Sequence, residues 1–111
     1  MKLNQGDIYL ANLDPTKGHE QSGYRPVLVM QNNFLNKNLN TVVVAPLTTN
    51  LQAKDKLTTY FLLANETKLK NDSVVLLFQI RTIDKDRLNK KVSSLKTNIF
   101  YEIKKQLNFI F

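Results

Sequence analysis

The chain has 111 residues, 42% of them hydrophobic, which is enough for one compact domain over residues 1–111 and too short for two. It has no cysteine, which excludes disulfides and thiolate metal sites and fits a reducing compartment, so we expect a cytoplasmic protein. The formal net charge of +7 favours a polyanionic partner such as nucleic acid, although an acidic peptide would be attracted just as well.

Five short runs rich in Val, Ile, Leu, Thr and Tyr predict β-strands. Clusters of Asn, Lys, Gly and Asp separate them and favour turns. In chain order the runs cover residues 7–13, 26–31, 41–46, 58–63 and 73–83. Five or more strands at this spacing predict a mainly β fold, a small antiparallel barrel.

The second and third strands are continuously apolar over residues 27–30 and 42–45, so both of their faces should be covered. The tail offers a cover, because apolar residues recur there at spacings of four, four and three. These are Ile99, Ile103, Leu107 and Ile110, with Phe100 and Phe111 flanking the stripe. The pattern predicts an amphipathic C-terminal helix docked on the sheet. No run approaches the ~18 apolar residues of a spanning helix, and we expect no membrane association.

Three segments between the predicted strands are polar. Residues 14–26 form a long loop that holds the single histidine and a Glu20–Arg25 spacing suited to chemistry. Residues 31–40 are rich in Asn and predict a short helical turn anchored by Phe34 and Leu35. Residues 50–57 are charged and have one apolar residue, which predicts a mobile loop.

Four blocks of residues keep their order and spacing over nearly the entire chain: 6–9 (Gly-Asp-Ile-Tyr), 14–29, 45–49 (Ala-Pro-Leu-Thr-Thr) and 72–84 apart from Phe78. Together they resemble the MazF/PemK family of toxin endoribonucleases, and the MazF branch most closely. The resemblance implies an SH3-like barrel that forms a homodimer and cuts single-stranded RNA, mRNA in particular, at short sequence motifs. It also implies that no metal or other cofactor is used, and that a MazE-like antitoxin neutralises the toxin and binds DNA together with it.

The chemistry of RNA fits a metal-free nuclease, because the ribose 2′-OH is a built-in nucleophile beside the phosphate. Such an enzyme needs a proton acceptor, a proton donor and stabilisation of the charge that develops on phosphorus. Arg25 is the first candidate, since its planar guanidinium matches phosphate oxygens. Thr48 resembles the second catalytic position of the family, where a hydroxyl can bind the phosphate. Glu20 is the best proton acceptor by residue type, or else it orients Arg25 or contacts a base.

Further residues match positions that line the RNA groove of the family, where amides and guanidinium groups can contact the edges of unstacked bases. His19 could act as acid, base or phosphate contact, but some family members carry Ser there, which argues against an essential proton role. The predicted RNA-binding residues are Lys17, His19, Gln21, Thr49, Phe78, Gln79 and Arg81.

Phe78 departs from the family pattern, because most members carry an acidic residue at this position. Leu76 likewise replaces an Arg of the PemK branch. Phe78 could stack on RNA and change the preferred motif, could lower activity, or could simply pack in the core or at a dimer interface.

Two alternatives remain at this point. The chain could be an SH3-like module that binds RNA without cutting it. It could also resemble the CcdB toxins, which share the fold class and poison gyrase through a C-terminal helix end, since this chain ends in Phe109-Ile110-Phe111. The presence of Arg25 and Thr48 together favours MazF, because a gyrase binder needs neither.

Overall fold

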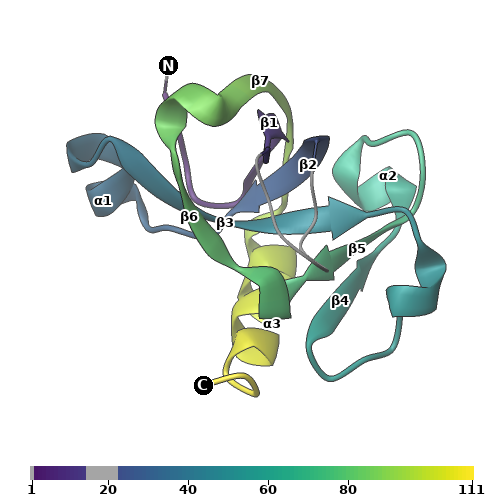
Figure 1. Ribbon diagram of the computed structural model, residues 1–111. Coiled ribbons are helices and arrows are strands. Elements are labelled where there is room, and N and C mark those ends of the chain that lie inside the picture. Colours follow the sequence, from purple (N-terminus) through teal and green to yellow (C-terminus); the bar gives the residue numbers. More distant parts are fainter. Residues whose placement is uncertain (1, 15–22) are drawn as a thin grey trace.

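The computed structural model of the protein describes residues 2–14 and 23–111. Within these residues, seven antiparallel strands form one strongly curled sheet, and a C-terminal helix crosses it (Figure 1). The strands are β1 (Asp7–Asn12), β2 (Tyr24–Val29), β3 (Thr41–Thr48), β4 (Thr59–Leu62), β5 (Ser73–Leu76), β6 (Arg81–Asp84) and β7 (Leu88–Ser94). The helices are α1 (Asn33–Asn38), α2 (Ala64–Thr67) and α3 (Thr97–Leu107), and single 3-10 turns cover Leu51–Ala53, Leu77–Gln79 and Lys85–Arg87. The prediction of a mainly β fold with a C-terminal helix is confirmed.

Strand β3 is the longest strand and organises the sheet. One edge of β3 pairs with β2, and the other edge is shared by two short strands. Its first half pairs with β6, and its last two residues pair with β5. The prediction of a single strand over residues 73–83 is therefore wrong, because a 3-10 turn divides this segment into β5 and β6. Leu77 and Ile80 both pack in the same cluster, and this spacing of three breaks the two-residue period of a strand.

Alternating side chains of the central strands enter two separate hydrophobic clusters. Ile8 and Leu28 point to one face, where Phe100 and Ile103 of α3 cover them. Tyr9 and Val27 point to the other face and join a second cluster. The expectation that both faces of β2 and β3 are covered is thus confirmed, as is the docking of α3. The expectation that Phe111 flanks the buried stripe is wrong. Phe111 lies beyond the end of α3, and 85% of its surface is exposed.

Helix α1 is anchored by amide groups, which corrects the expectation that Phe34 and Leu35 hold it. Both apolar side chains are exposed, whereas Asn36 is buried. The Nδ2 of Asn36 donates to the Gln31 carbonyl at 2.8 Å, and the Nε2 of Gln31 donates to the Asn36 Oδ1 at 3.0 Å. A short helix can therefore be fixed by paired amides where its apolar residues face solvent.

Strand β7 had no counterpart among the predicted strands. It pairs with β1 across two register shifts, and three consecutive residues near its start are exposed. Its sequence, Leu-Asn-Lys-Lys-Val-Ser-Ser, lacks the apolar alternation by which strands are recognised. Among the described residues, no helix is both long and apolar enough to cross a membrane.

Candidate functional site

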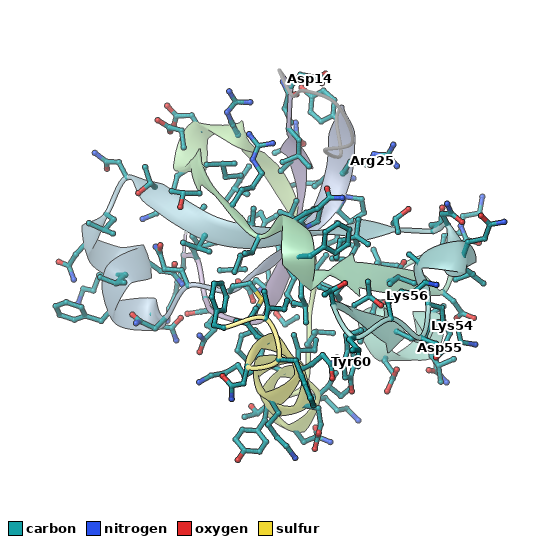
Figure 2. All side chains as sticks on the ribbon, turned by 60° about the horizontal axis from the view of Figure 1, so that its bottom comes forward. Asp14, Arg25, Lys54, Asp55, Lys56 and Tyr60 are labelled. Carbon is teal, nitrogen blue, oxygen red and sulfur yellow. The ribbon has the colours of Figure 1, made fainter. Side chains whose placement is uncertain are left out.

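The sheet brings Arg25 and Thr48 to one end of one face. In the β2–β3 ladder Val27 lies opposite Pro46, where the pairing of these two strands ends. Arg25 and Thr48 each lie two residues beyond this pair, on the same end of the two strands. Because side chains alternate between faces, both residues share the face of Val27 and Val29. Figure 2 shows Arg25 at the outer end of β2. We call this end of the face, defined by Arg25, Thr48 and Arg81, the rim.

Arg81 completes the rim from a third strand. Its ladder partner is Val44, which points to the same face as Arg25 and Thr48. Its Nη1 donates to the carbonyl of Leu13 at 3.4 Å, where β1 ends. Two guanidinium groups and a hydroxyl from three strands therefore lie along one face, an arrangement suited to an oxyanion such as phosphate.

Thr48 is placed for donation to a ligand. It is the last residue of β3 and is partly exposed, and its Oγ1 accepts a hydrogen bond from the Asn50 N–H at 3.1 Å. Because a hydroxyl can accept and donate at once, its hydrogen remains for a phosphate oxygen. The neighbouring Thr49 is exposed.

The long polar loop starts and ends beside the rim. The Leu13 N–H donates to the Gly23 carbonyl, and the Gly23 N–H donates to the Asp14 Oδ1, both at 2.9 Å. Gly23 has a φ of +73°, a conformation that strains any residue with a side chain. Arg87 also donates to the carbonyls of Asn12 and Asp14. The predicted residues Lys17, His19, Glu20 and Gln21 fall on this loop and lie outside the described residues.

Phe78 does not belong to the core of this chain. It lies in the 3-10 turn between β5 and β6 with 51% of its surface exposed. Its N–H donates to the Thr58 carbonyl at 3.3 Å, which fixes the turn against the start of β4. Packing in the core is thus wrong for Phe78, whereas contact with RNA, lowered activity and packing at a dimer interface remain as explanations. Gln79, next in the turn, is partly buried.

The structure adds Lys54 and Phe61 to the neighbourhood of the site. Thr48 lies opposite Val74, and Val74 lies opposite Phe61, so one row across the sheet joins the rim to β4. The Lys54 Nζ lies 4.4 Å from the centre of the Phe61 ring, a cation–π contact. Figure 2 shows Lys54 with Asp55 and Lys56 beside β4. Sequence spacing gives no signal for this pair, because Lys54 follows a 3-10 turn outside the strands and reaches Phe61 only where the chain folds back into β4.

Residues 50–57 hold more structure than a mobile loop. Leu51–Ala53 is a 3-10 turn capped by Asn50. The Thr59 hydroxyl donates to the Ala53 carbonyl at 2.8 Å and accepts from the Lys56 N–H at 3.3 Å. A polar side chain from the next strand therefore holds this segment in place of the missing apolar anchors.

Two tyrosines have perturbed pKa values, and neither lies at the rim. Burial raises the pKa of Tyr60, and the carboxylates of Glu102 and Glu66 raise it further. Burial, followed by the charge of Asp7, raises the pKa of Tyr9. Both phenols stay protonated at neutral pH, and each packs with a core cluster. Within residues 2–14 and 23–111, no three His, Asp or Glu side chains form a group that could hold a metal ion.

Comparison with known proteins assigns the chain to a family. Residues 4–111 match the model of the PemK-like, MazF-like toxins of type II toxin-antitoxin systems. The chain is 42% identical to Endoribonuclease MazF of Staphylococcus epidermidis over 107 residues, which are 96% of this chain and 88% of that protein. It is 43% identical to the protein of the same name from Staphylococcus saprophyticus over 102 residues, 91% of this chain and 84% of the relative.

Solved structures agree on the fold. The crystal structure of MazF (Form-I) from Deinococcus radiodurans superposes with a TM-score of 0.83 at 24% identity and covers 99% of this chain and 96% of that one. A mycobacterial endoribonuclease solved in complex with its cognate antitoxin gives a TM-score of 0.74 at 22% identity, with 97% and 91% covered. Sequence and fold therefore agree that the chain belongs to the PemK/MazF family of toxins of type II toxin-antitoxin systems.

Proposed function

We propose that this toxin is a metal-independent endoribonuclease that cuts single-stranded RNA, mRNA above all, at a short sequence motif. The observation that carries the proposal is the shared face of Arg25, Thr48 and Arg81, which gathers phosphate-binding groups from three strands. The name Endoribonuclease MazF, carried by two relatives above 40% identity, supports the same activity. RNA supplies the nucleophile for such a site, so the protein needs to supply only charge stabilisation and proton transfer.

In the proposed reaction the ribose 2′-oxygen attacks the adjacent phosphorus, and the bond from phosphorus to the 5′-oxygen breaks. The 2′-OH loses its proton to a base, and the leaving 5′-oxygen gains a proton from an acid. The products are a 2′,3′-cyclic phosphate and a 5′-OH end. Arg25 holds two phosphate oxygens and neutralises the developing charge, while the Thr48 hydroxyl donates to the same phosphate. Glu20 is the candidate base, and Arg25 itself is a poor one because a guanidinium offers hydrogen-bond donors and no acceptor.

The partners we propose follow from charge and apolar exposure. A chain with a net charge of +7 suits an antitoxin whose binding segment is acidic, and a mycobacterial structural relative has been solved with its cognate antitoxin. Phe109 and Phe111 leave 73% and 85% of their surfaces exposed at the tail, which favours a homodimer that covers them. Membership of the PemK/MazF family favours this explanation of the aromatic tail over a CcdB-like gyrase contact.

The activity can be tested with purified protein and a long unstructured RNA in the presence of EDTA. We expect cleavage at a recurring motif, with cyclic phosphate on the upstream product and a 5′-OH on the downstream one, because no step requires a metal. Mapping both ends by sequencing and by kinase labelling identifies the chemistry. Cleavage that stops in EDTA and returns with Mg²⁺ would disprove the metal-free route. Binding without any cleavage would leave an RNA-binding module as the function.

Replacing Phe78 by Glu should change the preferred cleavage motif. The exposed aromatic ring can stack on a base, whereas a carboxylate can only accept hydrogen bonds from one. The measurement is the sequence logo of cleavage ends for both proteins on the same RNA pool. Leu63→Glu serves as the matched control, because Leu63 is also exposed but lies between β4 and α2. An unchanged logo for Phe78→Glu would show that Phe78 does not contact the bases.

A further inference from the structure

A cationic pocket lies near the end of the sheet where β3 begins. It has a volume of about 620 Å³ and opens between the N-terminal segment, α1 and the turn after β6. The residues that carry its chemistry are Lys2, Lys37 and Lys85 with Asn4, Asn33 and Asn36, and no described lining residue is acidic. We call it the lysine–asparagine pocket. It lies near the first residue of β3, whereas Thr48 of the rim is the last, so the length of an eight-residue strand, roughly 20 Å, separates the pocket from Thr48.

Lys85 gives the pocket a positive charge that the protein does not neutralise. The side chain is half-buried, and its Nζ donates to the carbonyl of Asn36. Among the described residues no carboxylate lies within ion-pair distance of it, although Asp84 and Asp86 are its neighbours in sequence. The Asp84 carboxylate instead accepts from the Asp86 N–H at 2.9 Å. A partly buried ammonium with a neutral partner favours an anion beside it.

The acidic residue on the adjoining strand is also committed elsewhere. Asp7 forms an ion pair with Lys91 at 3.4 Å and accepts a hydrogen bond from the Ser94 hydroxyl at 2.7 Å. It also accepts from the backbone N–H of Asn4 at 3.0 Å, which fixes the N-terminal wall of the pocket. No carboxylate of residues 2–14 and 23–111 forms an ion pair with any of the three lysines, so their charge is available to a ligand.

Asn33, the first residue of α1, presents a donor in a fixed orientation, whereas the Nδ2 of Asn36 donates both of its hydrogens within the protein. The Asn33 Oδ1 accepts from the Gln5 N–H at 2.7 Å and from the Asn36 Nδ2 at 3.4 Å. Since its oxygen is used within the protein, Asn33 offers its NH₂ group to the pocket. Asn36 is 3% exposed and locked by its paired bonds with Gln31, so the helix that carries Asn33 and Lys37 is held in place.

We propose that the lysine–asparagine pocket binds a backbone phosphate of the RNA strand outside the cleaved motif. Donors reach the pocket from three chain segments, and a phosphate accepts hydrogen bonds in several directions, whereas a carboxylate offers two coplanar oxygens. None of the described lining residues is aromatic, so the pocket suits the RNA backbone and not the bases. The proposal rests on the proposed endoribonuclease function, because the RNA strand bound at Thr48 must continue for roughly 20 Å to reach the pocket.

The test compares RNA of two lengths on the intact protein. Uniformly 2′-O-methyl RNA lacks the nucleophile, so binding is measured without cleavage. An oligomer of about 5 nucleotides can occupy only the rim, whereas one of about 20 nucleotides can reach both the rim and the pocket. For Lys37→Gln/Lys85→Gln we expect roughly tenfold weaker binding of the long RNA and unchanged binding of the short one. The slope of log affinity against log salt concentration should be smaller by about 0.7 to 1.4 for the long RNA.

The control variant Lys70→Gln/Lys104→Gln removes the same charge from exposed positions outside the pocket. It should change the affinity for the long and the short RNA equally. Lys37→Gln alone, at an exposed position, should show the same length dependence if the double variant is unstable.

Three results would overturn the proposal. Equal effects of the pocket and control variants on the long RNA would show only general charge attraction. Inorganic phosphate that shifts the Asn33 side-chain amide signals in NMR, with RNA affinity unaffected by the variants, would assign the pocket to a free phosphate. A polyglutamate peptide that binds in a Lys85-dependent way, with RNA unaffected, would assign it to an acidic protein. None of these depends on cleavage, so a protein that binds RNA as expected but never cuts it would contradict the nuclease proposal and not this one.

Discussion

Arg25→Ala should lower the rate of RNA cleavage about 10³-fold, with a much smaller change in KM. Arg25 and Thr48 lie on the same face, two residues beyond the last β2–β3 pair, and removing a charged group from a phosphoryl-transfer site takes away transition-state stabilisation. Arg25→Lys should recover little of this loss, because an ammonium keeps the charge but not the planar fork. Single-turnover cleavage of a fixed RNA in EDTA, with the enzyme in excess and its concentration varied, separates the rate of cleavage from binding.

Two controls make the Arg25 result specific. Lys90→Ala removes a positive charge from an exposed position on β7 and should leave the rate nearly unchanged. Circular dichroism and thermal melting of Arg25→Ala should match the original protein, since Arg25 lies near the end of its strand. If a folded Arg25→Ala protein cut RNA within tenfold of the original rate, another group would have to stabilise the transition state. Thr48→Ala should reduce the rate in the same assay, and by less, because it removes one neutral donor.

Ile103→Ala should lower the free energy of unfolding by roughly 2–5 kcal/mol, the second large effect we expect. Ile103 is fully buried where α3 covers the sheet, in the cluster that also holds Ile8 and Leu28. Truncation leaves a cavity between helix and sheet that the packed strands cannot fill. Urea unfolding followed by circular dichroism gives the change, at one protein concentration because association of subunits would shift the midpoint.

Lys104→Ala is the matched control on the same helix. Lys104 is the next residue, is exposed, and has the same helical backbone, so the variant should change stability by less than about 0.5 kcal/mol. A loss below about 1 kcal/mol for Ile103→Ala would show that the packing of α3 on the sheet contributes little to folding.

Much of the candidate site could be predicted from the sequence because it depends on residue type and on local order. The family blocks identify Arg25, Thr48 and Arg81 as candidates, and strand pairing gathers these three on one face. The unbroken apolar runs of β2 and β3 likewise predict that both faces of these strands are covered. The apolar stripe of α3 covers one of the two faces. Such patterns survive in a single sequence because burial constrains every second residue of a strand and every third or fourth residue of a helix.

Other features depend on contacts between distant segments. The sequence by itself determined a basic, mainly β toxin of the PemK/MazF family with Arg25 as its first catalytic candidate. Only the tertiary structure divided the predicted strand 73–83 at an exposed Phe78, paired the polar strand β7 with β1, and anchored α1 through Gln31 and Asn36. It alone gathered Lys37 and Lys85 in one pocket. The physical reason is that hydrogen-bonded polar groups and uncompensated charges have no periodic signature, since their energy depends on partners far away in the chain.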